Sequence, residues 1–358
     1  MKKYLSNLDW SILMALFILL ILGLFAIASV APQLFLPQTL YAFLGLVLFF
    51  LFSQLDYRVL ERLVLFIFSG SIGLLLLTFL FGTITRGTVR WIQIGGFTVQ
   101  PSEMVKPFLV VFFAWFFSHS QMNLRRFLAG GLLLLLPFIL VVWQPDLGSS
   151  LVIAFSWLGI VLGAGLAWQL LGLGTATIVM GFPLLWRLLK EYQRQRVLSF
   201  LNPLSDPLGA GYNLIQATIT VGSGQLLGRG FGRGTQSHLR FLPERQTDFI
   251  FASFAEELGF IGSMILLAAF GFLLWRILVI ARETKDPFGY LICLGIFSMI
   301  SFQVFVNIGM NLGLLPITGI TLPLISYGGS SLVSTMISLG LVGSVARRNR
   351  KREVVEIR

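Results

Sequence analysis

Long apolar runs follow one another along almost all of the 358-residue chain, and no other feature constrains its fold as strongly. A helix needs about 20 residues to cross the roughly 30 Å hydrocarbon core of a membrane, because it rises about 1.5 Å per residue. Charged residues make up only 11% of the chain, whereas soluble domains carry roughly 25%. An ordinary soluble enzyme, a disordered tail and a nucleic-acid-binding domain are therefore excluded, and we predict an all-α polytopic membrane protein.

Ten of these runs are bounded by charged residues or by Gly and Pro, and we predict about ten transmembrane helices in a single domain over residues 1–358. The first run is too long for the apolar region of a signal peptide and lacks a clear cleavage site, so we expect it to be retained. The predicted spans are Trp10–Ser29, Pro37–Ser53, Leu60–Phe81, Ser102–Ser118, Phe127–Val142, Ser149–Gly165, Trp168–Leu188, Phe249–Ile280, Phe288–Asn311 and Tyr327–Val345.

The positions of the basic residues predict how the spans are oriented. An even number of spans places both termini on one side of the membrane. If that side is the cytoplasm, the cytoplasmic segments carry 15 Lys and Arg residues and the short outer loops carry only Arg86 and Arg90. Cytoplasmic loops are enriched in Lys and Arg, so we expect a multi-pass protein of the cytoplasmic (inner) membrane with both termini in the cytoplasm.

One long segment, Leu189–Arg245, lies outside in this topology and is nevertheless basic. Counted from Arg187, it holds eight basic and three acidic residues. Long loops escape the orientation rule, and two interpretations are open: a solvated loop near anionic headgroups, or a docking surface for an anionic ligand. The motif Gly228–Gly234 permits the second, because glycines let backbone N–H groups face an anion and arginines add bidentate donors. Plain flexible loops show the same pattern.

Charged residues within apolar runs are candidates for function, because lipid tolerates them poorly. Glu103 and Lys106 lie three residues apart, which puts both on one helix face near the outer boundary. They are either a structural ion pair, or a lysine that faces a polar cavity and binds a phosphate while Glu103 positions it.

Acidic residues also gather where the eighth span begins. Asp248 follows Leu242–Thr247 at the outer interface, where Thr247 or Asp248 could simply cap the helix. Glu256 and Glu257 lie about 12 Å further along the same helix, at about 1.5 Å per residue. Two adjacent carboxylates at that depth need partners or water, which suggests a polar cavity within the bundle.

Two further patterns add polar groups to the outer half of the bundle. Gln303, Asn307 and Asn311 recur every four residues on the ninth span, and hydrogen bonding between helices is the favoured explanation of such a stripe. Gly313–Ser331 holds Pro and Gly at a density that breaks helices, and irregular backbone at membrane depth has to be covered by protein or line a wet cavity. We therefore expect binding or chemistry at the outer face.

The residue types in these patterns limit the chemistry. A carboxylate without a histidine partner suits general-base activation of a hydroxyl, and nearby cations suit a phosphate or pyrophosphate leaving group. His119, His238 and Cys293 are too few to build a familiar zinc site. The residues alone therefore favour transfer of a group from a lipid-phosphate donor to a hydroxyl. No cofactor is defined, and a divalent cation (Mg or Mn) held by carboxylates and a substrate phosphate stays open.

Nine short blocks, in order along the chain, carry a family resemblance. They are Arg90–Gly95, Gln100–Glu103, Gln144–Gly148, Tyr192–Arg196, Asp206–Tyr212, Gly234–Ser237, Thr247–Ala252, Asn307–Gly309 and Pro323–Ser330. Together they resemble the shape, elongation, division and sporulation (SEDS) family of bacterial cell-wall glycosyltransferases. The short termini and the Tyr192–Arg196 block favour its rod-shape branch over its division branch.

The resemblance implies polymerisation of lipid II into glycan strands at the outer face of the membrane. It also implies work in complex with a class B penicillin-binding protein, the transpeptidase. The essential acid of the family falls at Asp248, and Gln246 replaces a histidine that relatives often have, which argues against an obligatory His–Asp pair. The residues that we expect to bind substrate are Arg90, Trp91, Glu103, Lys106, Arg194, Arg196 and Glu244.

The resemblance also suggests a mechanism. Asp248 would take the proton from the C4 hydroxyl of the acceptor N-acetylglucosamine, whose oxygen would attack the anomeric carbon of the donor with inversion. Arg194, Arg196 and Lys106 would stabilise the departing undecaprenyl-pyrophosphate. A lipid II flippase and a scaffold for the transpeptidase are the alternatives. The clustering of polar features at one face favours the polymerase over a flippase, which needs access from both sides.

Overall fold

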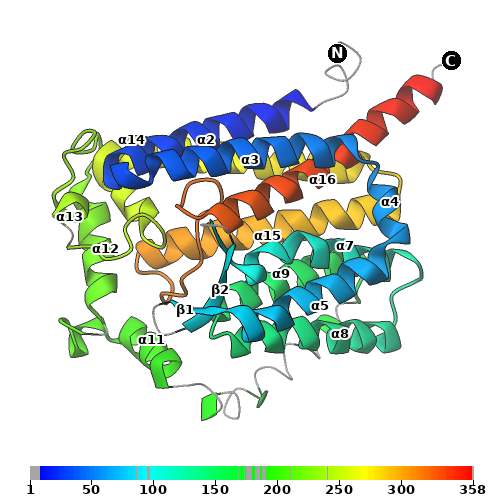
Figure 1. Cartoon of the computed structure of the whole chain (residues 1–358), viewed down its shortest axis with the longest axis horizontal. Helices are drawn as coiled ribbons and strands as arrows, with labels where there is room; N and C mark the ends of the chain where they lie inside the picture. The colour runs from blue at the N-terminus through cyan, green and yellow to red at the C-terminus, as the bar shows by residue number, and fades with distance from the viewer. Residues whose placement is uncertain are drawn as a thin grey trace.

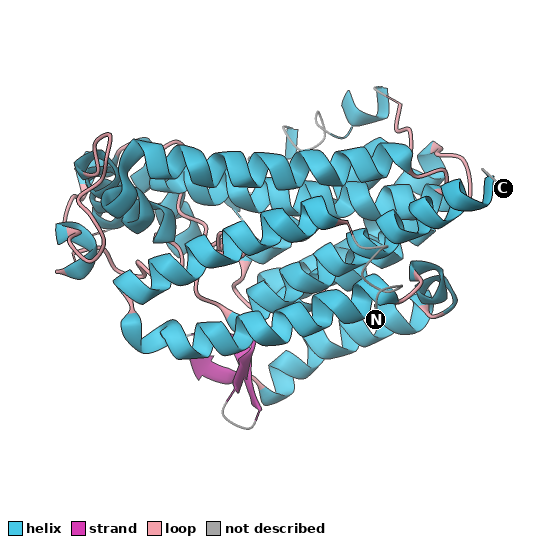
Figure 2. Ribbon diagram, turned by 90° about the horizontal axis from the view of Figure 1, so that it is seen from above, coloured by secondary structure: helices cyan, strands magenta, loops and turns pink. Residues whose placement is uncertain are grey.

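The computed structural model describes residues 9–85, 88–94, 97–167, 169–172, 174, 180–181, 186–187, 191–209, 211–239 and 241–356. Long helices lie alongside one another, and a small sheet and several short helices flank them (Figures 1 and 2). The long helices are α2 (Trp10–Val30), α3 (Phe35–Gln54), α5 (Val64–Phe81), α7 (Lys106–Ser118), α8 (Leu124–Trp143), α9 (Leu147–Gly163), α14 (Ile250–Glu283), α15 (Pro287–Asn311) and α16 (Gly329–Glu356).

The shorter elements connect these long helices along the chain. The short helices are α4 (Tyr57–Arg62), α6 (Pro101–Met104), α11 (Glu191–Leu201), α12 (Tyr212–Ser223) and α13 (Thr235–His238), with 3₁₀ turns η1 (Pro32–Leu34) and η2 (Pro203–Ser205). The strands are β1 (Thr83–Thr85), β2 (Thr88–Ile94) and β3 (Phe97–Val99).

The prediction of an all-α polytopic membrane protein is confirmed. Seven of the described helices are long and apolar enough to cross a membrane. The predicted spans Ser102–Ser118 and Ser149–Gly165 correspond to the shorter helices α6 with α7, and α9. The predicted seventh span, Trp168–Leu188, lies largely outside the described residues.

The predicted outer loop after α5 contains a sheet that the sequence analysis did not foresee. β1 and β3 each pair antiparallel with β2, in the registers Ile84↔Val89 and Ile92↔Val99. Thr, Val and Ile dominate these strands, and β-branched residues favour extended backbone. Pairing with β1 and β3 on its two sides therefore holds β2 as the central strand.

The core lies between α15 and its neighbours, where small residues let helices approach closely. Gly159 of α9 faces α15, and a Cβ built there would lie 1.8 Å from Ser298 Oγ. Gly45 of α3 faces α16, where a Cβ would lie 2.8 Å from both Leu332 Cδ2 and Met336 Cγ. Close packing of small residues holds helices together in lipid, where no water is expelled from between them.

The two ends of the bundle differ. The start of α2, the end of α16 and helix α4 lie together at one end, here named the termini end (Figure 1). Helices α11, α12 and α13 lie at the opposite end, here named the cavity end (Figure 1). Helices α11, α12 and α13, which lie in the segment between α9 and α14, therefore cover the end of the bundle away from the termini (Figure 1).

A kink in α14 joins this covering segment to the bundle. Gly259 has φ 67° and ψ −163°, which interrupts the helix. The freed carbonyls of Glu256 and Glu257 accept hydrogen bonds from the backbone N–H groups of Arg229 (2.9 Å) and Gly230 (3.0 Å). The sequence analysis considered these N–H groups for an external anion. They serve the kink instead, so that part of the hypothesis is wrong.

Candidate functional site

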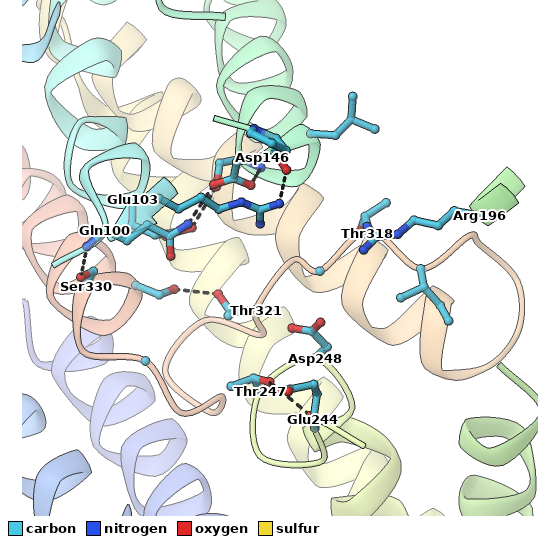
Figure 3. A pocket seen from close by; sticks show the side chains of 18 of the residues that line it. Gln100, Glu103, Asp146, Arg196, Glu244, Thr247, Asp248, Thr318, Thr321 and Ser330 are labelled. Carbon is cyan, nitrogen blue, oxygen red and sulfur yellow. Dashed lines mark hydrogen bonds between the residues drawn. The ribbon is translucent and has the colours of Figure 1, made fainter. Parts of the chain in front are cut away.

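A cavity of about 740 Å³ is lined in part by α11, one of the helices at the cavity end of the bundle. Segments far apart in the sequence form its wall: strand β2, helix α6, the turn before α9, helix α11, the turn before α14 and the irregular residues 312–328 (Figure 3). Six of the eight site residues that we predicted line it, namely Arg90, Trp91, Glu103, Arg196, Glu244 and Asp248.

Asp248 stands at the start of α14, and its backbone is anchored by α15. The Asp248 carbonyl accepts hydrogen bonds from Asn307 Nδ2 and Asn311 Nδ2, both at 3.0 Å. Asn311 Oδ1 also accepts from the Ala252 N–H at 3.1 Å. The predicted interhelical role of this polar stripe is confirmed for Asn307 and Asn311. The Asp248 side chain is half-buried and points into the cavity, and Arg196 reaches toward Thr318 on the far side (Figure 3).

The turn that carries Asp248 is held tightly on both sides. Glu244 has φ 50°, and its carbonyl accepts from the N–H groups of Thr247 (3.1 Å) and Phe249 (3.2 Å). Ser326 Oγ donates to the Thr247 carbonyl at 2.7 Å, so residues 312–328 cover the turn. The N-cap residue of α14 is Phe249, without a side-chain capping bond. The alternative in which Thr247 or Asp248 caps the helix is therefore wrong.

Glu103 and Lys106 form an ion pair, the first of the two predicted interpretations. Lys106 Nζ lies 2.5 Å from Glu103 Oε1, and both residues are buried. Ser149 Oγ also donates to Glu103 Oε1, at 3.2 Å. Glu103 faces the cavity, whereas Lys106 is absent from its wall. Lys106 thus neutralises Glu103 from behind and is not placed to contact a phosphate in this cavity.

Asp146 is a wall residue that the sequence analysis missed as a site residue. Its Oδ2 accepts from Gln100 Nε2 (2.8 Å) and Ser102 Oγ (2.7 Å), and its Oδ1 accepts from the Ser149 N–H (3.1 Å). Two features of the sequence could have identified it. It lies directly before a predicted span, and it belongs to the block Gln144–Gly148 that contributed to the family resemblance.

The three arginines that we predicted to bind substrate differ in whether they line the cavity. Arg90 Nε donates to the Gln144 carbonyl at 3.0 Å, and its Nη2 donates to the Pro145 carbonyl. Arg90 therefore holds the turn before α9 while lining the cavity. Arg196 lines the cavity from α11. Arg194 does not line it, because its guanidinium is turned toward the carbonyls of Trp186 (3.0 Å) and Arg187 (2.7 Å).

The buried carboxylates deeper in α14 have partners in the covering segment. Glu256 accepts from the N–H groups of Gln236 (2.8 Å) and Ser237 (3.0 Å) and from Ser237 Oγ (2.7 Å). Ser29 of α2 donates its hydroxyl to Glu257. The partners that we expected exist, but neither carboxylate lines the cavity. Both belong to the attachment of residues 228–238 to the bundle.

The cavity combines four carboxylates, Glu103, Asp146, Glu244 and Asp248, with Arg90 and Arg196. Tyr327 adds a phenol hydroxyl, which can donate or accept a hydrogen bond. Within the described residues, no group of three or more His, Cys, Asp or Glu side chains is placed to hold a metal ion. The arrangement can deprotonate a hydroxyl at one point and stabilise an anion at another.

Comparisons with known proteins identify the family. The FtsW/RodA/SpoVE family model, described as cell cycle protein, matches residues 9–351. Peptidoglycan glycosyltransferase MrdB of Escherichia coli K12 is 43% identical over 305 residues, which cover 84% of this chain and 82% of MrdB.

Two solved structures are similar over almost their full lengths. A chain from a study of how a peptidoglycan synthase complex coordinates polymerization and crosslinking has a TM-score of 0.84 and 34% identity, covering 96% of this chain and 98% of that chain. RodA of Thermus thermophilus has a TM-score of 0.73 and 31% identity, covering 96% of this chain and 97% of RodA. The chain therefore belongs to the FtsW/RodA/SpoVE family, the SEDS proteins, and is of the RodA type.

Proposed function

We propose that this chain is a peptidoglycan glycosyltransferase that polymerises lipid II into glycan strands during cell elongation. The relative MrdB is named a peptidoglycan glycosyltransferase. The observation that carries the proposal is the position of Asp248, whose carboxylate points into a cavity that Arg196 enters from the other side (Figure 3). Transfer of a sugar from a lipid diphosphate to the hydroxyl of another sugar requires a base for the hydroxyl and a cation for the diphosphate.

In this mechanism Asp248 accepts the proton of the C4 hydroxyl of the acceptor N-acetylglucosamine. The oxygen then attacks the anomeric carbon of the donor N-acetylmuramic acid as the bond to the diphosphate breaks, so the configuration inverts. Undecaprenyl-pyrophosphate leaves with the bonding electrons, and Arg196 stabilises its charge. A second carboxylate acting as a general acid is unnecessary for this single displacement, because the diphosphate leaves as an anion whose charge a cation stabilises and need not be protonated.

Glu103, Asp146 and Glu244 shape the remainder of the site. Their hydrogen bonds with Lys106, Ser102 and Thr247 hold them in place. We assign them to the binding of sugar hydroxyl and amide groups, for which carboxylates are good acceptors. Trp91 offers an apolar face for a sugar ring on the same wall. No step is assigned to a protein-bound metal.

We further propose that the cavity faces the outside of the cytoplasmic membrane and that a class B penicillin-binding protein is the partner. One similar solved structure comes from a peptidoglycan synthase complex that couples polymerization with crosslinking. Helix α4, which lies at the termini end (Figure 1), carries Arg58 and Arg62. Together with Arg125, Arg126, Arg282 and Lys285, they are among the basic residues that the positive-inside rule assigns to the cytoplasm.

The test is polymerisation of purified lipid II by the full chain in detergent. Asp248→Asn should lower the rate about 10²- to 10⁴-fold, the usual contribution of a general base, while the protein unfolds at the same temperature. Glu283→Gln is the matched control, because it removes an exposed carboxylate at the termini end. A folded Asp248→Asn protein with the normal rate would disprove the assignment of the base.

The same assay separates the rival functions. A flippase moves lipid between the two leaflets of a bilayer, and detergent solution has no leaflets. Glycan strands that form in detergent therefore come from a polymerase. If the wild-type chain forms no polymer, alone or with its transpeptidase partner, but moves lipid II across a bilayer, the flippase is correct. A scaffold predicts that Asp248→Asn leaves polymer formation by the complex unchanged.

A further inference from the structure

A second cavity lies between α7 and α8, at the termini end, and the proposed mechanism does not use it. Its volume is about 410 Å³, and its wall includes Trp115, Phe116, His119, Asn123, Arg125 and Arg126. We propose that this cavity binds the headgroup of an anionic phospholipid. Basic pockets between membrane helices are suited to such headgroups.

The cationic part of the cavity lies on the first turn of α8. The Arg126 guanidinium carbon lies 5.0 Å from the centre of the Phe116 ring, and Arg126 Nη2 donates to the Phe116 carbonyl. Arg126 Nε is buried, and no atom of the described residues accepts a hydrogen bond from it. Arg125 is exposed beside it. Arg125 and Arg126 both line the cavity, and guanidinium groups bind phosphate with charge-assisted hydrogen bonds.

A carboxylate beside the cavity already has a bonding partner. Glu61 Oε1 lies 3.0 Å from His119 Nε2, so this acid has its partner in the histidine. Asn123 caps α8 by accepting a hydrogen bond from the Arg126 N–H at 2.8 Å, which stabilises the backbone of the first turn that carries both arginines. The cavity therefore offers a ligand two cations from one helical turn.

The surface next to the arginines fits an acyl chain. Arg125, Ala129, Leu132 and Leu136 recur at helical spacing and form one line along α8. Leu132 is 70% exposed and Leu136 is 46% exposed. The line is about 17 Å long at 1.5 Å per residue. Trp115 lies at the end of this line that is next to the arginines, and tryptophan is enriched at the membrane–water interface of membrane proteins. These features favour a lipid over a free phosphate ion.

The proposal predicts selective retention of lipid by the purified full chain. Mixed with equal amounts of phosphatidylglycerol and phosphatidylcholine, the protein should retain mainly phosphatidylglycerol in native mass spectrometry. Removing both charges with Arg125→Gln and Arg126→Gln should lower phosphatidylglycerol binding about fivefold for each arginine. Arg282→Gln, an exposed arginine at the same end but outside the cavity, should leave binding unchanged.

A second variant keeps the test decisive if the double variant folds poorly. Ala129→Trp fills the cavity and keeps both charges, because Ala129 lines the cavity and is exposed. It should lower phosphatidylglycerol binding without lowering the unfolding temperature. Equal binding of the two lipids, or unchanged binding in both variants, would overturn the proposal. Displacement of phosphatidylglycerol by millimolar inorganic phosphate would also overturn it, since the site would then recognise a phosphate ion alone.

Discussion

Two side-chain amides of α15 hold the backbone of Asp248, while the carboxylate of Asp248 faces the cavity. At the scale of single residues, the groups that position Asp248 are thus different from the carboxylate that is proposed to take the proton. Asn311 uses both ends of its amide, because it donates to the Asp248 carbonyl and accepts from the Ala252 N–H. Asn307 donates to the Asp248 carbonyl and to the Ile320 carbonyl. Together they connect the turn before α14 with the irregular residues 312–328.

We expect Asn311→Ala to lower lipid II polymerisation about tenfold or more, because small displacements of a catalytic group have large effects on rate. The free energy of unfolding should fall by about 1–3 kcal/mol, because the Ala252 N–H loses its acceptor. The measurements are the polymerisation rate and thermal unfolding in detergent. Gln303→Leu is the control, because Gln303 is buried on the same helix about 12 Å away. Equal losses of activity in both variants would contradict the positioning role.

The arginines of α11 offer a second comparison at this scale. Arg196→Gln should lower polymerisation roughly tenfold to a hundredfold, because a charge-assisted hydrogen bond contributes about 1.5–3 kcal/mol. Arg194→Gln should have a clearly smaller effect, because the Arg194 guanidinium is bonded to the Trp186 and Arg187 carbonyls and does not line the cavity. The measurement is the initial rate of polymerisation by each variant at several lipid II concentrations. The opposite ranking would show that Arg194 contacts the diphosphate.

At the scale of elements, the kink in α14 is a joint between the bundle and its cover. The helix is broken at Gly259, and residues 225–230 complete the hydrogen bonds on both sides of the break. Phe260 N–H donates to the Gln225 carbonyl at 2.8 Å, and Ile261 N–H donates to the Leu226 carbonyl at 3.2 Å. Lipid cannot satisfy such backbone groups, so the kink and the covering segment stabilise each other.

Gly259→Ala should therefore destabilise the protein strongly. Its φ of 67° with ψ of −163° is a conformation that is essentially restricted to glycine, and a new Cβ would lie 2.3 Å from Gly228 N. We expect a loss of at least about 1–3 kcal/mol, seen as a lower unfolding temperature.

Gly271→Ala in the same helix is the control, because nothing lies within 4 Å of a Cβ built there. Alanine has the higher helix propensity by about 1 kcal/mol, so this variant should be neutral or slightly stabilised. A normal unfolding temperature for Gly259→Ala would show that the kink is not needed.

At the scale of the whole molecule, the termini end and the cavity end lie at opposite ends of the bundle. The start of α2 and the end of α16 lie together at the termini end, as the predicted even number of spans leads us to expect (Figure 1). Because Cys293 is the sole cysteine of the chain and is buried, its removal gives a background in which single cysteines report membrane sidedness.

In a Cys293→Ala background, Leu208→Cys should react with a membrane-impermeant maleimide on intact spheroplasts. Leu208 is 89% exposed in the segment between α11 and α12. Glu283→Cys, exposed at the termini end, should react only after the membrane is permeabilised. The reverse pattern of labelling would place the cavity in the cytoplasm and contradict the proposed function.

The sequence predicted most of the fold because membrane helices follow a local rule. Each span must be apolar along its own length, whatever its neighbours are. Trp10–Ser29 and Phe288–Asn311 therefore match α2 and α15 within two residues at each end. The small sheet was missed because strands β1 to β3 are short and polar enough to look like a loop. The kink was missed because one glycine in an apolar run does not reveal its backbone angles.

The sequence by itself determined that this is a helical membrane protein, which of its charged residues are candidates, and which family its motifs resemble. Only the tertiary structure decided which candidates meet. Asp248 and Asn307 are 59 residues apart and in contact, whereas Lys106 and Arg194 turn away from the cavity that their neighbours Glu103 and Arg196 line. The physical reason is that apolarity is a property of each segment alone, while a side chain's partner depends on how distant segments pack.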